Sequence, residues 1–156
     1  MEEQLITFET AKLAKEKGFN PEYSSHMFSK NGSEYCKDNY PLLSKDNWWK
    51  NNKIGFSKRY ARPTQSLLQR WIREKRGVHI EIERNASGYY WGMCRSDGGT
   101  NLGWSDMKGP NDGAVWDSFE EALEAALQLQ LSYDLPKTLK KIGHWSNYVD
   151  YAYLNK

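Results

Sequence analysis

The strongest constraint on the fold is a strict alternation of apolar and polar residues from 78 to 83. It predicts a β-strand with one apolar face and one polar face. The run 85–88, Asn-Ala-Ser-Gly, predicts a turn, and residues 89–95 predict the returning strand of a hairpin. A four-residue turn fixes the register. The predicted pairs are Ile82 with Trp91, Ile80 with Met93, Glu83 with Tyr90, Glu81 with Gly92, and His79 with Cys94.

A helix and a second hairpin are predicted before residue 40. Segment 8–17 carries a narrow apolar stripe, with Thr7 as its N-cap and Gly18 as its C-terminal stop. Segments 22–29 and 34–38 are predicted to pair through the turn at 30–33, because its Asn-Gly pair supplies positive φ angles.

Two more helices flank the alternating hairpin. Pro63 suits the first position of one helix, Thr64 offers a cap oxygen, and Gly77 ends it. Ser118 and Glu121 form the capping box of the other, which has a wide apolar face. Segments 39–62 and 97–117 show no sustained periodicity, so both are predicted to be loops.

The predicted order is helix, two strands, helix, two strands, helix. This order indicates an α+β fold, with an antiparallel sheet of two hairpins and about three packed helices. We expect a single domain over residues 1–135. An aromatic C-terminal tail, 136–156, is expected to pack on this domain or to extend from it.

The basic residues are concentrated in one part of the chain. The net charge is only +2, yet residues 37–76 hold 11 of the 22 Lys and Arg and 3 of the 20 Asp and Glu. Aromatic residues are interleaved with these cations. Cations contact phosphates, and an exposed aromatic ring can stack on an unpaired base for about 1–3 kcal/mol. The segment therefore predicts a surface for RNA, a nucleotide or an acidic protein face.

The alternative is a solvated loop whose tryptophans are buried in the core. The candidate binding residues are Lys45, Trp48, Trp49, Lys50, Lys53, Lys58, Arg59, Tyr60, Arg62, Arg70, Arg73 and Arg76.

The sequence offers no convincing catalytic or metal-binding group. His79, Glu81 and Cys94 share one predicted sheet face, and a Cys–His pair can form a thiolate nucleophile. No third residue is evident to orient such a pair, so we interpret this face as polar surface. The His and Cys residues lack the spacing of a zinc site. We therefore predict no catalytic residues, no metal and no cofactor.

Two further classes are disfavoured. The glycine-rich run 97–104 lacks the lysine of a P-loop, although its amides could form an anion-binding nest. No apolar run approaches the roughly 18–20 residues of a membrane span. The acidic N-terminus lacks a signal-peptide pattern, so we expect a cytoplasmic protein.

Four runs of the chain resemble small uncharacterised proteins of phages and prophages in Bacteroidetes. They are residues 8–19, 62–75, 79–82 and 119–124, of which the second holds the most distinctive motif, PTQSLLQRWIREK. Arg62 stands where a small residue is more usual in these proteins, and the tail after Tyr133 extends past their usual end.

The resemblance implies an accessory protein that acts in the host bacterial cytoplasm. Such proteins commonly inhibit host antiviral defence. Our leading hypothesis is a non-catalytic anti-CRISPR protein that binds an effector nuclease, its guide RNA, or both. The alternatives are a sponge that sequesters a signalling nucleotide and a structural or morphogenetic phage protein. The oligomeric state is left open.

Overall fold

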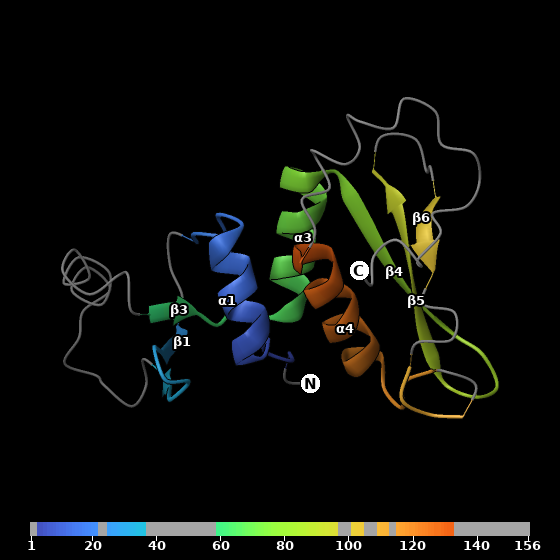
Figure 1. Ribbon diagram of the computed structural model, residues 1–156, viewed down its shortest axis with the longest axis horizontal. Helices are drawn as coiled ribbons and strands as arrows, with labels where there is room; N and C mark the ends of the chain where they lie inside the picture. The colour runs from blue at the N-terminus through green and yellow to red at the C-terminus, as the bar shows by residue number, and fades with distance from the viewer. Residues whose placement is uncertain are drawn as a thin grey trace. The chain divides into compact units, whose positions relative to one another are not determined.

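The computed structural model describes residues 3–21, 25–36, 59–96, 101–104, 109–112 and 115–132. Helices and strands follow one another in the predicted order, with one added strand after each hairpin, and the α+β class is confirmed (Figure 1). The elements are α1 (Phe8–Glu16), β1 (His26–Ser29), β2 (Glu34–Cys36), β3 (Arg59–Ala61), α3 (Gln65–Arg76), β4 (Val78–Arg84), β5 (Tyr89–Arg95), β6 (Asn101–Trp104) and α4 (Phe119–Ser132).

The chain divides into two units, Met1–Leu68 and Gln69–Lys156, and the division falls inside α3. Each hairpin belongs to a sheet of its own, with strand order β2-β1-β3 in the first and β4-β5-β6 in the second. A single domain over 1–135 stays a prediction. The predicted tail 136–156 lies outside the described residues.

Both ends of α1 form as predicted. The Thr7 hydroxyl accepts a hydrogen bond from the amide of Thr10. At the other end Gly18 adopts a φ of 89°, a left-handed conformation that glycine reaches without strain. Its amide donates to the Lys15 carbonyl and the next amide, that of Phe19, donates to Ala14. This is the Schellman ending, and it folds Phe19 back into the core, where the side chain is 7% exposed.

The first sheet is built on the predicted Asn-Gly hairpin. β1 pairs with β2 in the register Met27 to Tyr35, and Gly32 in the turn has a φ of 86°. The prediction of a loop over 39–62 is wrong at its end, because β3 pairs antiparallel with β1. Three residues are too few to show alternation, and the partner strand lies far back in the chain. The rest of this loop, up to residue 58, lies outside the described residues.

The start of α3 differs from the prediction by two residues. The helix begins at Gln65, and the Thr64 hydroxyl accepts from the amide of Leu67, so Thr64 is the cap. Pro63 precedes the cap instead of opening the helix. Its carbonyl accepts from the amide of Ile6, next to an antiparallel bridge between Leu5 and Thr64. Because the chain stays extended up to Thr64 in this pairing, the first helical turn begins two residues later than predicted.

In the second sheet all five predicted pairs of β4 and β5 form, and the pairing runs on to Val78–Arg95 at one end and Arg84–Tyr89 at the other. The predicted loop 97–117 is wrong at β6, which pairs with β5. α4 begins after Ser118, whose hydroxyl accepts from the amide of Glu121, and it packs on β4 and β5 (Figure 1). The core of this unit is fully buried. It contains Val78, Ile80, Trp91, Ala122, Leu123, Ala126, Leu127 and Leu131.

Candidate functional site

Half of the predicted binding residues can be placed in the structure. Arg59, Tyr60 and Arg62 lie in the first unit, and Arg70, Arg73 and Arg76 lie on α3 in the second. The others lie outside the described residues; they are Lys45, Trp48, Trp49, Lys50, Lys53 and Lys58.

Arg59 and Tyr60 have different surroundings on β3. The Arg59 side chain is exposed, and its carbonyl accepts a hydrogen bond of 2.7 Å from the ammonium of Lys15. Tyr60 is half-buried. Its ring meets the Phe8 ring edge-on at 5.4 Å, and the Lys15 ammonium lies 4.9 Å from its centre. Tyr60 is therefore part of an aromatic cluster on α1, and Arg59 is the residue of the two that faces solvent.

Arg62 is engaged within the first unit. Its guanidinium forms a 2.8 Å ion pair with Glu34, and its Nε donates to the carbonyl of Ile6 at 3.3 Å. The same group lies 4.9 Å from the centre of the Phe28 ring. The ion pair and the hydrogen bond use the edge of the planar guanidinium, and the Phe28 ring lies against its face. Arg62 therefore links β2 to the end of β3 and has its charge balanced locally.

The three arginines of α3 differ in how far their charge is paired, buried or exposed to solvent. Arg70 pairs with Glu74 one turn later at 2.8 Å, and this contact raises the pKa of Arg70 and lowers the pKa of Glu74. Arg76 is half-buried and donates from Nη2 to the carbonyl of Gln130 at 3.4 Å. Arg73 is exposed in the last turn. Of the three, Arg73 presents its charge most openly.

The polar sheet face does not favour nucleophilic chemistry. His79 stands opposite Cys94, as predicted, and its Nε2 lies 3.5 Å from the Glu81 carboxylate. Burial, and secondly the charge of Glu81, raise the pKa of the Cys94 thiol. A reactive thiol needs the opposite shift. Among the described residues, no three His, Cys, Asp or Glu side chains come together as a metal site.

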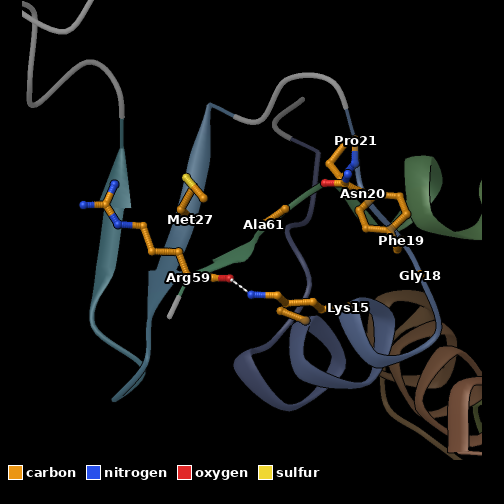
Figure 2. Close-up of a pocket in the computed structure, with 9 residues that line it drawn as sticks. Lys15, Gly18, Phe19, Asn20, Pro21, Met27, Arg59 and Ala61 are labelled. Atoms are coloured by element: carbon orange, nitrogen blue, oxygen red, sulfur yellow. Dashed lines mark hydrogen bonds between the residues drawn. The ribbon is translucent and has the colours of Figure 1, made fainter. Parts of the chain in front are cut away.

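A pocket of about 230 Å³ opens in the first unit, between the end of α1 and the sheet (Figure 2). It is lined by Ala11, Lys15, Gly18, Phe19, Asn20, Pro21, Met27, Arg59 and Ala61. Sequence reasoning missed this pocket and the part played by Lys15 in it. The signal could not be read locally, because the contact from Lys15 to Arg59 spans 44 positions.

No protein-family model, no curated protein and no solved structure matches this chain. No helix in the described parts of the chain is long and apolar enough to span a bilayer.

Proposed function

We propose that this protein is a non-catalytic phage accessory protein that inhibits a host CRISPR effector by binding its guide RNA. The observation that carries the proposal is the concentration of half of all Lys and Arg in residues 37–76, interleaved with aromatic residues. That combination suits a single-stranded nucleic acid, since cations hold the backbone and rings stack on unpaired bases.

The described residues are compatible with this use of the segment. Arg59 and Arg73 present exposed guanidinium groups on regular secondary structure, so their positions are defined before any partner arrives. Arg62 and Arg70 are paired with Glu34 and Glu74, so we assign them to stability rather than to RNA contact.

The experiment is a binding titration of the purified protein against a CRISPR effector loaded with guide RNA, against the empty effector, and against the guide RNA alone. A fourfold variant replaces Lys50, Lys53, Lys58 and Arg59 with glutamine. A matched control replaces Lys137, Lys140, Lys141 and Lys156 with glutamine, which removes the same charge from another part of the chain.

We expect the protein to bind both the loaded effector and the guide RNA. Only the fourfold variant of the basic segment should lose affinity, by about tenfold or more. Affinity should fall steeply with salt, because phosphate contacts release counterions. Equal loss in both variants would show a general charge effect. Binding to the empty effector alone, or no binding and no effect on interference, would overturn the proposal.

A second candidate is a sponge that sequesters a signalling nucleotide. The pocket beside Lys15 favours it, since a cation and an apolar floor suit a small phosphorylated ligand. Calorimetry with a panel of cyclic nucleotides tests it, and stoichiometric binding is the expected result.

A further inference from the structure

The floor of the pocket in the first unit is apolar and rigidly held. Met27 on β1 and Ala11 on α1 are each 1% exposed, and Phe19 is fixed by the Schellman ending of the helix. Ala61 on β3 stands opposite Met27 in the sheet, so both side chains lie on the same face. Close-packed side chains of this kind define a slot whose shape does not depend on a ligand.

The wall of the pocket carries positive charge. Lys15 comes from the last turn of α1, and its ammonium is held by the hydrogen bond to the Arg59 carbonyl (Figure 2). Arg59 lines the pocket with its backbone carbonyl, and its guanidinium extends away from Lys15 and Phe19 (Figure 2). No Asp or Glu belongs to the described residues that line the pocket. The charge of this wall therefore favours an anionic group.

Lys15 lacks full solvation at this position. Burial lowers the pKa of its ammonium. An anion beside a partly desolvated cation interacts more strongly than it would in bulk water, because the local dielectric constant is lower. A phosphate at this wall would stabilise the charged form of Lys15, so ligand binding and the charge of this lysine support each other.

We infer that the pocket binds one nucleotide, with the base in the slot formed by Phe19, Met27 and Ala61 and the phosphate against Lys15. At about 230 Å³ the pocket is smaller than the roughly 300–1,000 Å³ of sites for drug-sized ligands, so it suits one ring system. Proteins that hold unpaired bases use apolar and aromatic walls of this type. The inference rests on the proposed function in one respect, because the nucleotide can be an unpaired residue of the guide RNA.

The probes are the four ribonucleoside 5′-monophosphates, the four nucleosides, inorganic phosphate, an unstructured RNA hexamer and an acidic hexapeptide. Amide resonances of the uniformly labelled protein report the binding position. We expect a monophosphate or the hexamer to shift the amides of Gly18, Phe19, Asn20, Met27 and Ala61. The matching nucleoside is expected to bind about tenfold more weakly, because it lacks the phosphate.

Two variants test the two parts of the site. Lys15→Gln removes the cation, and Ala61→Leu fills the slot. Lys12→Gln is the matched control for the first, because Lys12 lies on the same helix and does not line the pocket. We expect Lys15→Gln and Ala61→Leu each to weaken nucleotide binding by about five- to tenfold, and Lys12→Gln to leave it unchanged. Melting curves of all three variants report whether the fold is intact, and Lys15→Gln carries the test if Ala61→Leu unfolds.

The outcomes separate the sources of the ligand and the two proposals. Tighter binding of free monophosphate than of the hexamer assigns the site to a small nucleotide, and the reverse assigns it to RNA. If RNA and the monophosphate both still bind at full affinity in Lys15→Gln and Ala61→Leu, the pocket inference fails and the proposed function stands. If monophosphate binds at the pocket and guide RNA does not bind, the proposed function fails and the pocket inference stands. Equal binding of inorganic phosphate, tighter binding of the acidic peptide, or no shift at these amides overturns the inference.

Discussion

Gln130 is the clearest local defect in the second unit. Its side chain is 0% exposed on the inner side of α4, and within the described residues neither its Oε1 nor its Nε2 has a hydrogen-bond partner. A buried polar group without a partner costs about 1–3 kcal/mol. We therefore predict that Gln130→Met, which keeps the length and removes the polar atoms, raises the free energy of unfolding by about 1–2 kcal/mol. Urea denaturation measures the change.

The matched control makes the same substitution where the amide is satisfied. Gln69 donates from Nε2 to the carbonyl of Ile80 at 2.9 Å. Gln69→Met removes this donor, so it should lower the free energy of unfolding by about 1 kcal/mol. A decrease in both variants would show that the Gln130 carboxamide has a stabilising partner after all.

The thiol of Cys94 gives a second prediction for a single residue. Its pKa is raised first by burial and second by the negative charge of Glu81. At a pH near the ordinary thiol pKa, Cys94 should therefore react with iodoacetamide more slowly than a model thiol, because it holds its proton to a higher pH. Glu81→Gln should shift its rate profile to lower pH. Mass spectrometry of the peptide containing Cys94 separates this reaction from that of Cys36.

The same shift has a consequence for stability. Between the unfolded and the folded pKa of this thiol, the folded protein binds more protons than the unfolded chain. The free energy of unfolding therefore falls as pH rises through that window. A Cys94→Ser variant should lose this part of the alkaline decline. A decline of equal size in the variant would assign it to other groups.

The β4–β5 turn depends on one glycine. Gly88 has a φ of 155°, and a Cβ at this position would lie 2.5 Å from the carbonyl oxygen of Trp116. Tyr89 and Trp116 exchange two backbone hydrogen bonds of 2.9 Å beside it. Gly88→Ala adds backbone strain and a steric clash, so we predict a loss of about 2–4 kcal/mol in the free energy of unfolding.

The control for this turn is its neighbour. The Ser87 side chain is exposed, and it is the Ser87 amide that donates to the Asn85 side chain. Ser87→Ala keeps that amide and should change stability by less than about 0.5 kcal/mol. A change of less than about 0.5 kcal/mol for Gly88→Ala as well, in thermal and urea unfolding, would contradict the predicted clash with the Trp116 carbonyl.

Sequence reasoning succeeded for elements whose partners are local. The register of β4 and β5 followed from alternation and a four-residue turn, and the Thr7 and Ser118 caps followed from nearby residues. β3 and β6 were missed because strands of three or four residues carry little pattern and their pairing is not local. The same limit applies to the site. The binding role of Arg59 stays a prediction, and the pairing of Arg62 with Glu34 could not be predicted because it depends on the tertiary structure.

At the scale of the molecule, a net charge of +2 conceals a strongly basic segment. If Arg59 contacts a phosphate of single-stranded RNA, its removal has a defined electrostatic effect. The plot of log affinity against log salt concentration has a slope of about −0.7 for each phosphate neutralised. We therefore predict that Arg59→Gln makes this slope shallower by about 0.7 for binding to the guide RNA.

The control for this prediction is Arg84→Gln. Arg84 is exposed on β4, outside the basic segment, and its guanidinium lies 5.6 Å from the centre of the Tyr89 ring. Both variants lower the net charge by one, so a general attraction between protein and RNA weakens equally in both. A direct contact changes the slope in Arg59→Gln alone, because counterion release counts phosphates that are neutralised rather than total charge. Equal slopes in the two variants would remove Arg59 from the RNA surface and leave the contacts to the segment that precedes it.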